Sequence, residues 1–183
     1  MKINKKTEED ILKELPQNIS APIFCLNKEI NYKLRVAARK ILVKMGRAIL
    51  PKLNNLLAIE DNALRWEVAK VIELIGEKES IPVFIKLLED SDSGIRWIAA
   101  DGLINIGRES IIPLLKSIIN QKEESYFLRL SAHYILTELF NPSEKKKFKS
   151  LMQSIQSYGL IGESTVLEVY NALRIIEKQK EKS

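Results

Sequence analysis

The sequence predicts an all-α solenoid of stacked helical hairpins, and a repeated local pattern leads to this prediction. The pattern has a period of about 30 residues, which is typical of solenoids in which each unit buries its apolar face against its neighbours. Each copy has an arginine, a glycine 11 residues later and then a proline: Arg35, Gly46 and Pro51; Arg65, Gly76 and Pro82; Arg96, Gly107 and Pro113. A fourth, degraded copy starts at Arg129.

Each copy also carries the signals that begin and end a helix. The residue four positions before the arginine is of a type that caps helix N-termini through its side-chain oxygen: Asn31, Asp61, Asp92 and Ser125. The three glycines stand where a left-handed residue would end the helix. The fourth copy has Phe140 there, and Asn141-Pro142 supplies the stop.

Between these signals, apolar or small residues recur at helical spacing, so this stripe is predicted to be core. Relative to the arginine, the positions −1, +3, +6, +7 and +10 carry Leu34, Ala38, Ile41, Leu42 and Met45; Leu64, Val68, Val71, Ile72 and Ile75; Ile95, Ala99, Gly102, Leu103 and Ile106; and Leu128, Ala132, Ile135, Leu136 and Leu139.

A second helix is predicted after each glycine, because proline is tolerated in the first turn of a helix. These helices are expected at residues 50–59, 81–90 and 111–121, with Ser80 and Ser110 as N-caps. Each unit is therefore predicted to be a helical hairpin.

The repeats resemble the HEAT-repeat superfamily, in particular the short repeats first noted in phycobilisome bilin lyases. Their consensus is Asp-x-x-Val-Arg-x-x-Ala-Ala-x-Ala-Leu-x-x-Ile-Gly. The third copy matches it at Asp92, Ile95-Arg96, Ala99-Ala100, Leu103 and Ile106-Gly107, and the second matches well, with Val68-Ala69 at the alanine pair. The first copy departs from it at Arg39 and the fourth at His133. The resemblance covers residues 28–140 and implies a right-handed solenoid.

The same resemblance has two implications for individual residues. The arginines Arg35, Arg65, Arg96 and Arg129 would form a structural ladder that bonds acidic or carbonyl groups between adjacent repeats. The face opposite the core stripe would line the concave side of the solenoid.

The chain is predicted to be one domain with capped ends. Residues 1–30 would form an N-terminal capping segment with short helices at 7–15 and 21–26, and residues 31–140 the repeats. Residues 141–178 would form a capping hairpin, with a first helix from Ser143 to about Tyr158 and a second over 163–178, before a tail at 179–183.

The predicted concave face holds the candidate binding site. At about 100° per residue, the position after each arginine points away from the core stripe, and it is occupied by Val36, Trp66, Trp97 and Leu130. Tryptophan and tyrosine are frequent anchors of binding sites. The predicted binding residues are Trp66, Trp97, Tyr32, Lys40, Lys44, Lys70, Asp101, Asn105, Tyr126 and Tyr134. The alternative is that neighbouring repeats or the C-terminal hairpin bury both indole rings.

Charge on this face is expected to differ between its halves. Lys40, Lys44 and Lys70 would make the N-terminal half positive unless they are simply solvated, whereas Asp101 and Glu138 lie in the other half. The whole chain has a net charge of +5 and a pI of about 9.2, which permits binding to nucleic acid without demonstrating it.

The composition favours a cytoplasmic protein. No apolar run approaches the roughly 20 residues needed to span a bilayer. The first ten residues lack the apolar core of a signal peptide. The single cysteine, Cys25, excludes an internal disulfide framework.

No catalytic residue, metal site or cofactor is predicted. His133 and Cys25 are expected to fill structural positions, and Glu89, Asp90 and Asp92 are too weak a cluster for metal ligation. The favoured function is a non-catalytic module that binds a protein or peptide segment in the concave groove. The alternatives are nucleic-acid binding, a bilin lyase-like protein, or a relative of the HEAT-like DNA alkyl-base glycosylases, to which Trp97 and Asp101 at i and i+4 bear a resemblance.

Overall fold

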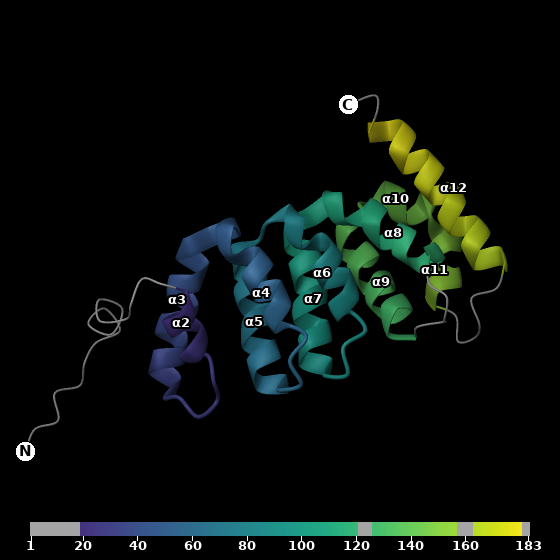
Figure 1. Ribbon diagram of the computed structural model, residues 1–183. Helices are drawn as coiled ribbons and strands as arrows, with labels where there is room; N and C mark the ends of the chain where they lie inside the picture. Colours follow the sequence, from purple (N-terminus) through teal and green to yellow (C-terminus); the bar gives the residue numbers. More distant parts are fainter. Residues whose placement is uncertain (1–18, 121–125, 157–162, 181–183) are drawn as a thin grey trace, which may run out of the picture. The chain divides into compact units, whose positions relative to one another are not determined.

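The computed structural model describes residues 19–120, 126–156 and 163–180, and all regular structure in these ranges is helical (Figure 1). The described chain forms two compact units, Met1–Glu77 and Lys78–Ser183. Both consist of helical hairpins, which confirms the predicted all-α fold. The expectation of one domain stays a prediction, as do the helix at residues 7–15 and the cap at Ser125, which lie outside the described residues.

The described part of the first unit, from residue 19 on, contains four α-helices. They are α2 (Ser20–Phe24), α3 (Tyr32–Met45), α4 (Leu50–Leu56) and α5 (Asn62–Ile75), with a 3₁₀ turn at Gly46–Ile49 between α3 and α4. The long helices α3 and α5 pack on each other, while α2 packs on α3 and α4 on α5.

The second unit contains the remaining described helices. It comprises α6 (Ile81–Leu87), α7 (Ser93–Ile106), α8 (Ile111–Asn120), α9 (Tyr126–Leu139), α10 (Pro142–Lys147), α11 (Lys149–Gln156) and α12 (Glu163–Lys180), with 3₁₀ turns at Lys78–Ser80 and Gly107–Ser110. The long helices α7 and α9 pack on each other. Helix α12 packs on α8 and α11 and so closes the C-terminal edge of this unit (Figure 1).

The predicted boundaries of the long helices α3, α5 and α7 are confirmed, whereas α4 and α6 end three residues before the predicted ends at residues 59 and 90. Side chains of Asn31, Asp61 and Asp92 accept hydrogen bonds from backbone N–H groups in the first turns of α3, α5 and α7. The three glycines that end these helices have φ angles of +64°, +70° and +88°. A side chain at such a φ would strain the backbone, which explains why glycine stands at these positions.

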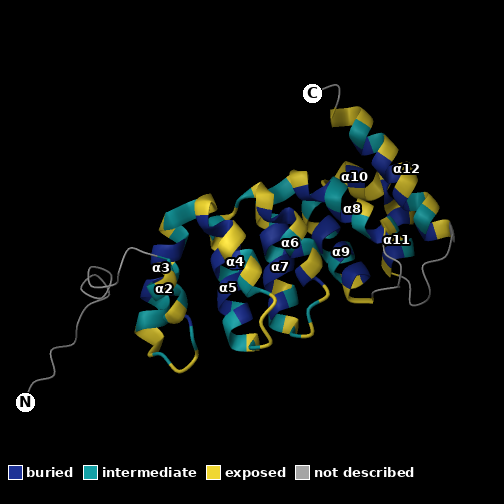
Figure 2. Ribbon diagram, viewed as in Figure 1, coloured by how far each residue is buried: buried dark blue, intermediate teal, exposed yellow. Residues whose placement is uncertain are grey.

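The predicted apolar stripe forms the core of each unit. Leu42 and Ile72 in the first unit, and Leu103 and Leu136 in the second, have no exposed side-chain surface. Positions at the ends of the stripe, such as Met45 and Ile106, are only partly buried. Along every long helix, buried and exposed residues alternate with the helical turn (Figure 2).

Two details of the predicted caps were wrong. The Ser80 and Ser110 side chains do not cap α6 and α8; instead the Ser110 hydroxyl donates to the carbonyl of Leu103, at 2.8 Å, near the end of α7. The predicted helix from Ser143 is two helices, α10 and α11. It is Asn141 that caps α10, in a reciprocal capping box with Glu144.

Arg35, Arg65 and Arg96 hold the links that precede α3, α5 and α7. The Nη1 atom of Arg65 donates to the carbonyls of Ile59 and Glu60, at 2.9 and 3.0 Å. Arg96 makes the same pair of bonds to the carbonyls of Asp90 and Ser91. The carbonyl bonds implied by the resemblance are therefore present, and they satisfy backbone acceptors in the links between successive hairpins.

One core position of α7 is a glycine because an aromatic ring occupies the space beside it. A Cβ atom at Gly102 would lie 2.6 to 2.9 Å from three ring atoms of Phe84, a fully buried residue of α6. The missing side chain thus lets α6 and α7 pack closely.

Replacing this glycine tests the close packing. Gly102→Ala should lower the free energy of unfolding by about 1–3 kcal/mol through overpacking, although alanine favours helix more than glycine. Urea unfolding measures the change. Asn105→Ala on the exposed side of α7 is the matched control and should be nearly neutral; an equal or higher stability of Gly102→Ala would contradict the packing.

An ion pair anchors α10 to the 3₁₀ turn that precedes α8. The Arg108 guanidinium donates to both carboxylate oxygens of Glu144, at 3.0 and 2.5 Å. The hydrogen bond from Arg108 holds the pKa of Glu144 below its usual value, and a backbone hydrogen bond from Asn141 acts in the same direction.

This lowered pKa predicts a loss of stability in acid. Because the unfolded chain takes up the proton at a higher pH, about 4.3, than the folded chain, the contribution is complete above that pH and is lost as pH falls through the folded pKa. Glu144→Gln can keep the capping box but should cost about 1 kcal/mol or less at pH 7. Urea unfolding from pH 7 to 3 should show a smaller acid loss for this variant; an unchanged loss would contradict the assignment.

Candidate functional site

The outward face of α7 and α9 carries aromatic, aliphatic and acidic side chains. We define this face by the positions −3, +1, +5 and +9 from each arginine, which hold Ser93, Trp97, Asp101, Asn105, Tyr126, Leu130, Tyr134 and Glu138. The Trp97 side chain is 56% exposed and that of Leu130 53%. Large apolar groups with this much exposure on neighbouring helices are candidates for a binding surface.

The centre of this face is an aromatic stack between the two helices. The rings of Trp97 and Tyr134 lie 5.1 Å apart between centroids, at an interplanar angle of 25°. Tyr134, on the next long helix, thus covers one side of the Trp97 indole, while more than half of the Trp97 side chain still faces solvent. Within this unit, the C-terminal helices do not bury Trp97.

Carboxylates surround the tyrosine of the stack. Desolvation raises the pKa of the Tyr134 phenol, and the negative charges of Asp101 and Glu138 raise it further. Both carboxylates are therefore close enough to act on Tyr134. The structure brings together Trp97, Asp101 and Tyr134, as the sequence predicted for this half of the face.

Sequence reasoning missed a second aromatic contact beside the stack. The guanidinium carbon of Arg96 lies 3.9 Å from the ring centroid of Phe127, the residue after Tyr126 at the start of α9. The guanidinium of Arg96 is thus engaged by the Phe127 ring and by the carbonyls of Asp90 and Ser91, and the Phe127 ring in turn meets that of Tyr126 edge-on, at 5.8 Å between centroids. The sequence offers no signal for the cation–π contact, because it depends on how α9 lies against α7.

In the first unit, Trp66 is half-buried beside an ion pair. Arg39 donates to one carboxylate oxygen of Glu67, at 2.7 and 3.1 Å, and its guanidinium lies 5.8 Å from the Trp66 ring centroid. Arg35 also approaches Glu67, at 3.6 Å. Arg39, which departs from the repeat consensus, thus joins α3 to α5. In the same unit Tyr32 is 67% exposed.

The lysines of the first unit are arranged around an apolar hollow. A hollow of 440 Å³ between α3 and α5 is lined by Val36, Arg39, Lys40, Val43, Lys44 and Leu74. The ammonium group of Lys70 lies 2.6 Å from the carboxylate of Glu73 on its own helix. The charge of Lys70 is therefore balanced locally, which weakens the positive field predicted for this half.

Trp66 and Trp97 belong to different compact units, so their juxtaposition on one face stays a prediction. That the ten predicted residues form one binding site also stays a prediction.

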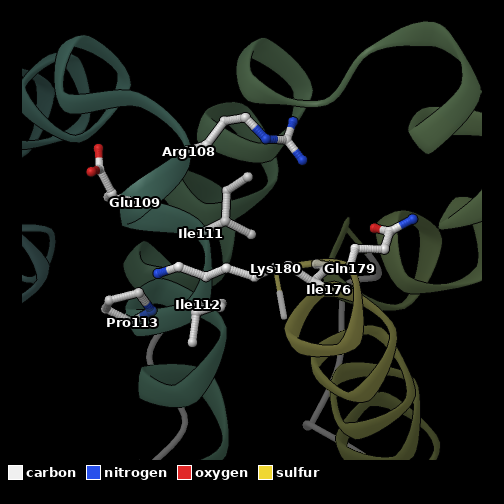
Figure 3. A pocket seen from close by; sticks show the side chains of 8 residues that line it. All are labelled: Arg108, Glu109, Ile111, Ile112, Pro113, Ile176, Gln179 and Lys180. Atoms are coloured by element: carbon white, nitrogen blue, oxygen red, sulfur yellow. The ribbon is translucent and has the colours of Figure 1, made fainter. Parts of the chain in front are cut away.

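A further hollow lies at the C-terminal edge of the second unit. Its volume is 390 Å³, and it lies between the start of α8 and the end of α12 (Figure 3). The residues lining it are Arg108, Glu109, Ile111, Ile112, Pro113, Ile176, Gln179 and Lys180. The hollow is lined by charged side chains of both signs, and one of them, Arg108, pairs with Glu144.

The remaining reactive residue types occupy structural surroundings. Burial lowers the pKa of His133 and raises the pKa of the Cys25 thiol, so both uncharged forms are favoured. In the described ranges, no three histidine, cysteine or acidic residues are grouped to hold a metal ion. Asp92 caps α7, and Asp90 accepts a hydrogen bond from the Asp92 backbone. No described helix is both long and apolar enough to cross a membrane.

Comparison with known families agrees with the geometry of the repeats. A family model of HEAT repeats matches residues 49–135, a range that includes α5 to α8 and most of α9. This segment consists of HEAT repeats. The match is to HEAT repeats in general and does not distinguish the bilin lyase type. A search of curated proteins found no match.

HEAT repeats are generally protein-interaction modules, and solenoids of this kind offer extended surfaces to partners. The matched segment contains both tryptophans, the Trp97–Tyr134 stack and Asp101, whereas Glu138 lies just beyond it. All of α3, with Tyr32, Lys40 and Lys44, also lies outside the matched range.

The exposure of Trp97 predicts that it contributes little to folding. Trp97→Ala removes the stack with Tyr134 and should lower the free energy of unfolding by about 1 kcal/mol or less. Trp66→Ala should cost more, because Trp66 is less exposed and contacts Arg39. Urea unfolding of both variants measures this; a loss of several kcal/mol for Trp97→Ala would assign the ring to the core.

Proposed function

We propose that this protein is a non-catalytic interaction module whose HEAT repeats bind a protein or peptide segment through the outward faces of their long helices. The exposed Trp97, stacked on Tyr134, is the observation that supports this most. An indole ring that is held in place by a neighbouring ring and still exposed loses little side-chain entropy when a partner binds it, which is the condition for a binding hot spot.

Exposed apolar groups next to the stack support the same proposal. Leu130 and Tyr126 lie one and two turns before Tyr134 on α9 and are about half exposed. Together with Trp97 they form a band across two packed helices rather than a single exposed residue. Contiguous exposed apolar area of this kind marks interaction sites in soluble proteins.

Nucleic-acid binding is the weaker alternative on this face. Neutralising phosphates requires lysine or arginine, and the outward face of α7 and α9 has neither. Arg96, which lies beside it, is engaged with Phe127 and with two backbone carbonyls.

The proposal predicts that replacing Trp97 weakens the binding of a partner but leaves the fold intact. The protein and its Trp97→Ala variant, each immobilised, should differ in the proteins that they capture, with the specific partner lost from the variant. A hot-spot tryptophan costs at least about 2 kcal/mol on truncation, or roughly thirtyfold in affinity.

The matched control is Leu167→Ala on α12, which removes another exposed apolar side chain from the same unit. It should retain the partner, and circular dichroism should be unchanged in both variants. A partner that binds the Trp97→Ala variant as tightly as the original protein would overturn the proposal for this face.

A further inference from the structure

On each of its two helices, the outward face of the second unit places a carboxylate one turn after an aromatic ring. Asp101 follows Trp97 on α7, and Glu138 follows Tyr134 on α9, in both cases at i and i+4, which lie on the same side of a helix. The stack at 5.1 Å brings the two aromatic turns together. The two acidic turns are consequently neighbours as well.

The charge of this face is opposite to that of the chain as a whole. Its eight positions include two carboxylates and no lysine or arginine, while the chain has a net charge of +5. Two arginines of the same unit have partners of their own: Arg96 lies over the ring of Phe127, and Arg108 pairs with Glu144. Desolvation raises the pKa of Tyr134, and the negative charges of Asp101 and Glu138 raise it further, so both carboxylates act on the stacked ring.

We infer that this face binds a basic peptide segment, with a lysine or arginine side chain over the Trp97–Tyr134 stack and its charge at Asp101 and Glu138. This inference rests on the proposed function and names the chemistry of the partner. Cations are attracted to the faces of tryptophan and tyrosine, and the carboxylates beyond the rings add Coulombic attraction. An anionic segment would be repelled by both carboxylates.

The apolar part of the face favours a peptide over a small cation. From Tyr126 to Glu138 the face extends for about 18 Å along α9, at 1.5 Å per residue. An extended peptide rises about 3.3 Å per residue, so five to six residues would cover this length. Leu130 and Tyr126 would contact an apolar side chain of the peptide while the stack and the carboxylates hold its basic residue.

A titration that follows Trp97 itself tests the inference. The chain has two tryptophans, so Trp66→Phe leaves Trp97 as the only indole. The probes are a capped hexapeptide with leucine at positions 1 and 3, arginine at position 5 and serine elsewhere, so that these three side chains share one side of an extended chain, and the same peptide with glutamine or glutamate at the arginine position. The arginine peptide should change the Trp97 fluorescence saturably, the glutamine peptide should bind at least about tenfold more weakly, and the glutamate peptide should not bind.

Charge-removing variants then locate the interaction. The double variant Asp101→Asn with Glu138→Gln should bind the arginine peptide about tenfold more weakly, as expected for two partly exposed ion pairs. The control is Glu89→Gln with Glu109→Gln, which removes the same charge from two exposed carboxylates of the same unit. It should change the affinity by less than about twofold.

The outcomes separate this inference from the proposed function. If the glutamine peptide binds as tightly as the arginine peptide, the inference is wrong and the proposed function stands, because the face then binds peptides without regard to charge. Equal losses in the two double variants, or a fluorescence response to a single-stranded oligonucleotide and to none of the peptides, would also overturn the inference. A response to the oligonucleotide alone would overturn the proposed function as well, because the face would then bind nucleic acid rather than a peptide.

Discussion

Every hairpin of this protein depends on an apolar stripe that its long helix cannot bury alone. Leu42 in α3 and Leu103 in α7 are fully buried only because α5 and α9, respectively, pack alongside them. At about 25 cal/mol per Å² of apolar surface removed from water, burial of such residues is the main favourable term for each unit. The same packing leaves the opposite side of each long helix facing outward, where Trp97 and Tyr134 meet.

The polar contacts determine the arrangement of the hairpins rather than supply most of the stability. The arginines near the starts of α3, α5 and α7 donate to carbonyls of the preceding link, as Arg65 does to those of Ile59 and Glu60. Positive-φ glycines turn the chain at the other end. Within the second unit, side chains on the outward sides of the neighbouring helices α7 and α9 form a common surface, as the contact of Trp97 with Tyr134 shows.

The second unit combines this scaffold with an aromatic and acidic surface. The stack joins Trp97, at position +1 of α7, to Tyr134, one turn later in its repeat at position +5 of α9, because the two helices pack against each other. The first unit has a different surface, with Trp66 next to the Arg39–Glu67 pair and lysines around a hollow. Repeats that share a core therefore present different chemistry outward, which is how one solenoid scaffold can serve different partners.

The sequence by itself determined the hairpins, their caps at Asn31, Asp61 and Asp92, and the buried stripe, because these follow from local backbone chemistry and helical periodicity. It also placed Trp97, Asp101 and Tyr134 on the outward side of their helices. Only the tertiary structure decided that Trp97 stacks on Tyr134 and that Arg39 pairs with Glu67. Both are contacts between two helices, so they depend on how the helices are aligned when they pack. That alignment follows from how side chains of different segments fit together, as Phe84 fits beside Gly102, and no single segment of the sequence specifies it.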